Sequence, residues 1–208
     1  MSPRWLLAAA VLLASCAPIT QSQTAQAYDL DALKSNGCGM TGDARDPDTQ
    51  ALDKLKNRHE APTEIDKSAT LAAMSAAKSG SNTFDSSKGA EVEGYLVKVT
   101  LEKGESCNCH STAKEDWDFH CYLAPTKNPS LNERLVVEVT PRMRKWTLAQ
   151  MRAMIGKRLK VTGWILDDAK HRDASEADTP GNEKNWRAST WEIHPVTELK
   201  PTGDLPPP

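Results

Sequence analysis

The chain has 208 residues, of which 26% are charged and 5% aromatic, and its formal net charge is −2. This length is enough for one domain of ordinary size with extensions at its ends. Proteins that bind nucleic acid mainly through its phosphates carry a basic surplus, so this charge argues against nucleic acid as a partner.

The first 16 residues have the pattern of a bacterial lipoprotein signal peptide. Arg4 precedes the apolar run WLLAAAVLLA, which is too short to span a bilayer as a mature helix and ends in LASC. LASC resembles a lipobox, in which the cysteine, here Cys16, is lipidated and becomes the new N-terminus. Because Ala17 follows, we expect a lipid anchor that holds the chain on the periplasmic side of the outer membrane. Secretion after cleavage at Ala27 is the alternative, and both interpretations predict export.

The next segment is polar and predicts an extension in front of the folded domain. Residues 17–47 are expected to form a tether, and residues 48–89 a helical extension and linker. Leu52 and Leu55 give one turn of apolar spacing to a first helix, and a second short helix is expected before the linker. At the other end of the chain, the proline-rich residues 201–208 predict a disordered tail.

Residues 90–200 predict the folded domain. Apolar and polar residues alternate in five segments, and apolar residues at helical spacing lie between the third and the fourth. This order, β-β-β-α-β-β, is that of the OB-fold, a five-stranded Greek-key barrel, so the expected fold class is mainly β. A five-stranded open sheet is the alternative. The residues expected to point inward are, in chain order, Tyr95, Val97, Val99 and Leu101; Phe119, Cys121 and Leu123; Leu135, Val137 and Val139; Leu148, Met151 and Ile155 of the helix; Leu159, Val161 and Ile165; and Trp191 and Ile193.

Four cysteines follow the signal peptide, at Cys38, Cys107, Cys109 and Cys121. An even number in an exported chain predicts disulfides, here two. Cys107 and Cys109 cannot pair with each other without strain, so we expect one to pair with Cys121 and the other with Cys38. The alternative is a metal site formed by CNCH, residues 107–110, together with Cys121.

Because side chains alternate between the two faces of a strand, the same pattern also predicts which side chains lie on the face opposite the core. If Phe119, Val137 and Trp191 point inward, the second, third and fifth strands bring acidic and imidazole side chains to one shared face. The candidate ligand-binding residues on this face are Asp118, His120, Tyr122, Glu138, Glu192 and His194. Imidazole and carboxylate groups are ordinary ligands of zinc and manganese. No cofactor is required by the pattern, but a divalent metal could be held by His120, His194 and Glu138.

Several roles fit this face. The first is binding of a ligand or partner without catalysis, for example an envelope glycan that stacks on exposed rings, or a protein. The rings that could take part are Trp117, Tyr122, Trp164 and Trp186. The second is a metal-dependent hydrolase or nuclease that uses the same residues, and the third is a single-stranded nucleic-acid-binding module. A structural role is also open, in which acid–imidazole pairs fasten the N-terminal segment to the barrel.

A set of short motifs supports the same fold. They are LKNRHEAP, ESCNC, DFHCYLAP, VVEVTPR, GKRLKVTGWILDDAKH and WEIHPVTEL. Together they resemble a family of bacterial exported OB-like proteins over most of the chain from Asp48 to Leu199. The resemblance implies that Lys56 to Arg58 belong with the barrel, and it brings no established activity. We therefore expect a cell-envelope lipoprotein with an OB-like domain that binds a ligand or partner.

Overall fold

The structure is a computed structural model that describes residues 38–203. The expected signal peptide, the lipobox Cys16, most of the tether and the last residues of the tail lie outside the described residues. No helix within residues 38–203 is long and apolar enough to cross a membrane.

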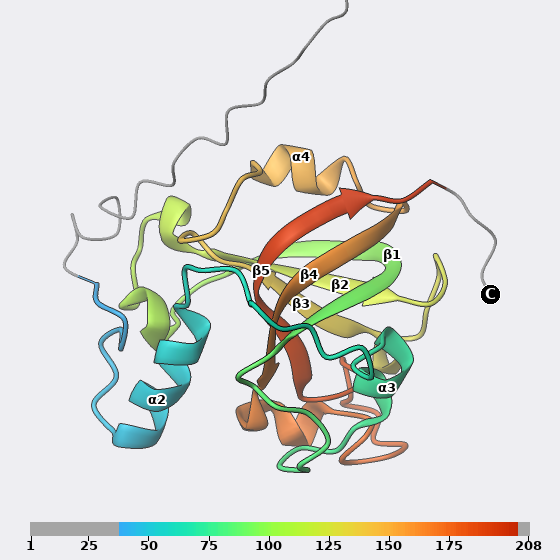
Figure 1. The fold of residues 1–208 in the computed structure, drawn as a ribbon, viewed down its shortest axis with the longest axis horizontal. Coiled ribbons are helices and arrows are strands. Elements are labelled where there is room, and N and C mark those ends of the chain that lie inside the picture. The colour runs from blue at the N-terminus through green and yellow to red at the C-terminus, as the bar shows by residue number, and fades with distance from the viewer. Residues whose placement is uncertain (1–37, 204–208) are drawn as a thin grey trace, which may run out of the picture.

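The described residues form a closed barrel with the strand order β1-β2-β3-β5-β4 (Figure 1). The strands are β1 (Gly89–Glu102), β2 (Asp118–Ala124), β3 (Leu135–Val139), β4 (Arg158–Asp167) and β5 (Trp191–Pro201). Neighbouring strands are antiparallel except β3 and β5, which are parallel. The helix α4 (Leu148–Arg152) lies between β3 and β4 in the chain. The structure thus confirms the mainly β, OB-like barrel with five strands.

The barrel core follows the expected alternation in four of the strands. The expected residues of β2 to β5 that belong to the buried core are Phe119, Cys121, Leu123, Leu135, Val137, Val139, Leu159, Val161, Ile165, Trp191 and Ile193. In β1 the expectation is confirmed for Val99 and wrong for Tyr95 and Val97, because Val92 and Leu96 are the buried residues in that stretch. An irregularity between Leu96 and Lys98 shifts the register toward β2. A bulge of this kind changes which face successive side chains occupy.

The helix α4 begins where the sequence predicts but ends earlier. The Thr147 hydroxyl accepts a hydrogen bond from the Gln150 backbone N–H, so Thr147 is the N-cap. Met151 is buried in the core, and Leu148 packs against it in part. Ile155 lies beyond the last helical residue and is 45% exposed, so its expected place in the core is wrong.

Two further helices, α2 (Pro47–Lys56) and α3 (Leu71–Ala76), lie on different sides of the barrel (Figure 1). Asp46 caps α2 by accepting a hydrogen bond from the Thr49 backbone N–H. The buried residues of α2 are polar, namely Asp53 and Lys56, while Leu52 and Leu55 are only half-buried. Such a helix has little apolar area to bury, so charged and polar contacts hold it against the barrel.

The segment in front of α2 is also fixed to the domain. The Arg142 guanidinium donates hydrogen bonds to the backbone oxygens of Cys38 and Gly39 and to the Asn57 side chain. The Asn57 amide in turn donates to the backbone oxygens of Met40 and Cys107. The part of the expected tether from residue 38 onward is therefore packed against the barrel.

The disulfides differ from the expectation. Cys38 is bonded to Cys109, which agrees with the prediction that one of the two neighbouring cysteines pairs with Cys38. The second predicted disulfide is wrong, because Cys107 and Cys121 are both free and buried. Cys121 points into the barrel core, whereas the Cys107 sulfur lies within 4.8 Å of a carboxylate oxygen of Asp118. Asp118 and Cys121 are three residues apart on β2 and face opposite sides of the strand, which separates the two thiols.

Candidate functional site

The strand register brings the predicted polar side chains together. His120 on β2 is directly opposite Glu138 on β3. Val137 of β3 pairs with Ile193 of the parallel strand β5, so Glu138 and His194 follow on the same face. Their side chains are in contact, with 3.5 Å between His120 Nε2 and Glu138 Oε1 and 3.4 Å between His194 Nδ1 and Glu138 Oε2.

The predicted face is covered rather than open. Asp118, Glu192 and His194 are fully buried, and Glu138 and His120 are only 4% and 6% exposed. Tyr122 is buried beside them, with its hydroxyl 3.2 Å from His120 Nδ1. These six predicted residues, together with Arg187, are called the buried cluster below. The ionisable groups of the cluster therefore interact in a medium that screens charge poorly.

Arg187, Glu192 and His194 form a chain of hydrogen-bonded charges. Arg187 is fully buried and donates to Glu192 Oε2 at 2.7 Å, while Glu192 Oε1 lies 3.1 Å from His194 Nδ1. Burial alone would raise the pKa of Glu192, but the Arg187 charge and the contacts with His194 hold that pKa well below its usual range. An ionised Glu192 fixes the orientation of the His194 ring and directs its second nitrogen, Nε2, away from Glu192.

Lys56 joins the helix α2 to the edge of the cluster. Its ammonium group lies 2.9 Å from Glu105 Oε1 and 2.9 Å from Asp168 Oδ2. Burial acts to lower the pKa of Lys56, but the charges of Glu105 and Asp168 more than offset it, so the pKa is raised well above its ordinary value. Lys56 is therefore a permanent cation, and its charge is matched by these two carboxylates.

The carboxyl groups of Asp118 and Glu138 have no cationic partner of this kind among the described residues. Neither carboxylate pairs with a Lys or Arg among residues 38–203. One Asp118 oxygen accepts a hydrogen bond from the Asn108 amide at 3.0 Å. Asp118 also meets the Glu105 carboxylate, with which it shares a hydrogen bond when it is protonated. One Glu138 oxygen and His194 Nε2 are buried without a hydrogen-bond partner in the described part of the chain. Burial, reinforced by the negative charge of Glu105, raises the pKa of both carboxyl groups well above the usual range.

A small pocket connects Glu138 and His120 with the surface. Its volume is about 150 Å³, and its lining residues are Thr100, Glu102, Glu105, His120, Tyr122, Glu138, His171 and Trp186. Burial lowers the pKa of His120 to about 4, so its imidazole is neutral at neutral pH. The Trp186 ring makes edge contacts with His120 at 5.7 Å and with His171 at 5.3 Å between centroids. The lining of the pocket therefore combines aromatic rings with carboxylates.

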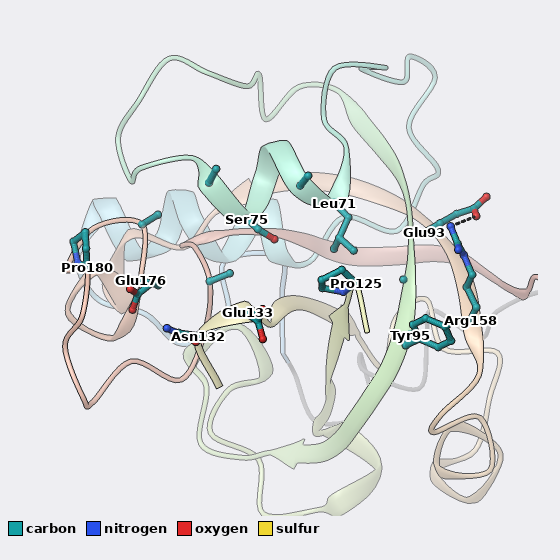
Figure 2. A pocket seen from close by; sticks show the side chains of 15 residues that line it. Leu71, Ser75, Glu93, Tyr95, Pro125, Asn132, Glu133, Arg158, Glu176 and Pro180 are labelled. Carbon is teal, nitrogen blue, oxygen red and sulfur yellow. Dashed lines mark ion pairs between the residues drawn. The ribbon is translucent and has the colours of Figure 1, made fainter. Parts of the chain in front are cut away.

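A larger hollow lies elsewhere on the barrel (Figure 2). This groove has a volume of about 650 Å³ and is bounded by α3, β1 and two loops. Leu71 and Ser75 face into it from α3, with Pro125 and Tyr95 across from them. An ion pair of 3.4 Å between Arg158 and Glu93 closes one end. No residue of the buried cluster lines the groove.

The sequence patterns did not reveal several residues of the site. Arg187 lies outside the alternating segments, and its position five residues before Glu192 is the available signal. Glu105 and Asp168 lie in loops, where period two gives no information about direction. Of the residues expected to hold a metal, Glu138 and His194 lie close together, and the third side chain grouped with them is Asp118 rather than His120.

Comparison of the chain with known protein families and with curated proteins finds no match. The chemistry of the buried cluster and its pocket is therefore the basis on which a function can be proposed.

Proposed function

We propose that the chain is an exported, lipid-anchored binding protein whose barrel holds a cation at the inner end of the pocket. The observation that carries this proposal is an imbalance of buried charge. Lys56 and Arg187 already have carboxylate partners, whereas Asp118 and Glu138 pair with no Lys or Arg of the described residues. A buried carboxylate needs a counter-charge or must remain protonated, so a cation that enters this site gains strong electrostatic stabilisation.

The size and the walls of the pocket support a small ligand. Pockets for organic ligands of ordinary size have volumes of roughly 300–1,000 Å³, and this pocket has about 150 Å³. That volume suits an ion with its waters or a compact ammonium group better than a nucleotide. The rings of His120, Tyr122 and Trp186 lie where a cation would meet aromatic surface as well as carboxylate. These features favour binding over the nuclease alternative.

A titration of the mature chain with two classes of cation tests this proposal. The probes are divalent metal ions, namely Mg²⁺, Mn²⁺ and Zn²⁺, and the organic cations tetramethylammonium and spermidine, each followed by calorimetry. We expect at least one class to bind, and the replacement Glu138→Gln to abolish that binding. Glu198→Gln, at a carboxylate whose side chain is 51% exposed, is the matched control and should bind like the unaltered chain. If neither class binds, the proposal fails.

The export and the lipid anchor rest on the N-terminal pattern around Cys16. The disulfide between Cys38 and Cys109 supports this part of the proposal, because such bonds persist mainly in oxidising compartments. Expression in a Gram-negative bacterium with a radiolabelled fatty acid tests it. The unaltered chain should take up the label and fractionate with the outer membrane, while Cys16→Ala should not be labelled. Equal labelling of the two would contradict the anchor.

A further inference from the structure

Three buried side chains of the cluster, each from a different strand, come close together. One donor atom each from Asp118, Glu138 and His194 lies within 4.8 Å of the other two. The separation between His194 Nε2 and Asp118 Oδ2 is 3.8 Å, which is too long for a hydrogen bond. Two ligands that each lie about 2.1 Å from one metal ion are separated by roughly 3–4 Å, so this spacing is that of a shared ion.

We propose that Asp118, Glu138 and His194 bind one divalent transition-metal ion. This inference rests on the proposed cation site and names its ion. The ligand set of one imidazole nitrogen and two carboxylate oxygens suits Zn²⁺ or Mn²⁺ better than Mg²⁺, which prefers oxygen ligands and retains its waters.

The surroundings of His194 have the form that metal-bound histidines require. A ligand imidazole usually donates its other N–H to a carboxylate, which fixes the ring and makes the ligand nitrogen a better donor. Glu192 lies 3.1 Å from His194 Nδ1, and Arg187 holds Glu192 from the other side at 2.7 Å. His194 Nε2 is thus left as the donor directed toward Asp118, while Glu138 Oε2 lies 3.4 Å from His194 Nδ1 and must turn toward Nε2 to share the ion. The three ligands come from β2, β3 and β5, so the barrel holds their spacing without any loop movement.

The pocket gives the ion its path and its remaining ligands. Glu138 lines the pocket and also belongs to the triad, so the ion site is continuous with the pocket. Glu105 and Cys107 form a second group of donor atoms that shares Asp118. Glu105 also lines the pocket, and one of its oxygens is buried without a hydrogen-bond partner among the described residues. Water from the pocket or the Glu105 carboxylate can complete a coordination shell of four.

Metal analysis of the chain from residue 17 onward, purified without an affinity tag, tests the inference. After treatment with a chelator and readdition of Zn²⁺, Mn²⁺ or Co²⁺, we expect one equivalent of metal per chain. Co²⁺ bound by an imidazole and carboxylates should also give a visible absorption band, which reports coordination rather than overall stability. Asp118→Asn keeps the shape of the side chain and should weaken Zn²⁺ binding by at least about 100-fold, beyond the 10- to 100-fold typical of a residue that only orients a ligand.

The controls separate this inference from the broader proposal. His110→Ala removes an exposed imidazole that pairs with Asp43, and it should bind metal like the unaltered chain. Uptake of tetramethylammonium or spermidine without any uptake of metal would overturn the metal site and leave the cation-binding function standing. Metal binding by the folded chain that Asp118→Asn and His194→Ala leave unchanged would also overturn it. Failure of every cation to bind would reject both.

Discussion

The pocket above the buried cluster and the groove beside α3 differ in how their charged groups are satisfied. In the groove, Arg158 pairs with Glu93, and Glu176 accepts a hydrogen bond from the Asn185 amide at 2.7 Å. Arg158 Nε is buried without a hydrogen-bond partner within residues 38–203, but the charge of Arg158 is matched by Glu93, and the Glu93 side chain is 36% exposed, so water can replace part of a lost contact. In the buried cluster, carboxylate oxygens and an imidazole nitrogen are buried without partners in the described part of the chain.

The larger hollow is therefore not the one whose buried polar groups would gain most free energy from a ligand. The groove has about four times the volume of the pocket, 650 Å³ against 150 Å³, but its polar groups gain little from a ligand that they do not already gain from water. A buried carboxyl group without a counter-charge must stay protonated or be ionised at a cost of several kcal/mol, and a bound cation offsets that cost. The two hollows should therefore respond differently to matched substitutions.

The largest difference in stability between the two hollows is expected when Arg187 of the buried cluster and Arg158 of the groove are replaced. Arg187→Ala removes a fully buried guanidinium that pairs with Glu192 and also donates to the backbone oxygens of Ser189 and Thr190. The uncompensated Glu192 should lower the free energy of unfolding by about 3–5 kcal/mol in urea titrations. Arg158→Ala, the matched change at the groove, should cost less than about 1 kcal/mol because its ion pair with Glu93 is partly exposed. Equal losses would mean that the two sites do not differ in burial cost.

Replacement of Glu138 should change the free energy of unfolding by a smaller amount than replacement of Arg187, and should raise it rather than lower it. Its carboxylate is 4% exposed and has no cationic Lys or Arg partner among the described residues. In chelator-treated protein, Glu138→Gln removes the cost of burying this group and should raise the free energy of unfolding by roughly 1–2 kcal/mol. Glu93→Gln at the groove should stay within about 0.5 kcal/mol. A clear loss of stability in Glu138→Gln would show that the carboxylate is already satisfied without a cation.

Much of this site could be predicted from period two. The alternation in β2, β3 and β5 placed Phe119, Val137 and Trp191 inward, and the opposite phase of the same strands gave Asp118, His120, Glu138, Glu192 and His194, which the structure brings together. The same rule was wrong for Tyr95 and Val97 in β1, where the irregularity after Leu96 reverses the phase. A bulge inserts one extra residue into a strand, and a single sequence gives no reliable signal of its position.

The cover of the cluster could not be predicted, because it comes from distant segments with no apolar pattern. Leu52 and Leu55 give α2 one turn of apolar spacing, yet the helix buries Asp53 and Lys56, which contact Ser106 and Glu105 respectively. Polar residues that are buried through specific partners look like solvated ones in a sequence. The second disulfide failed for a related reason. The alternation correctly placed Cys121 in the core, but Cys107 lies in a short turn before β2, where period two gives no information about direction.

The smallest expected effect concerns α3, which forms one wall of the groove. The Thr70 hydroxyl accepts a hydrogen bond from the Ala73 backbone N–H at 3.2 Å and is the N-cap of this helix. Thr70→Ala should lower the free energy of unfolding by about 1 kcal/mol and speed hydrogen exchange at the α3 amides. Binding of a cation in the pocket should not change, because no α3 residue lines the pocket.

Thr147→Ala is the matched control, since Thr147 caps α4 with the same geometry, at 3.2 Å from the Gln150 N–H, and lies outside both hollows. It should cost a similar free energy without faster exchange in α3. Loss of cation binding in Thr70→Ala but not in Thr147→Ala would mean that α3 and the buried cluster are coupled. The core packs α3 against β1, β3 and β5, so such coupling would have to pass through the barrel strands themselves, and the groove and the pocket would then be parts of one binding apparatus.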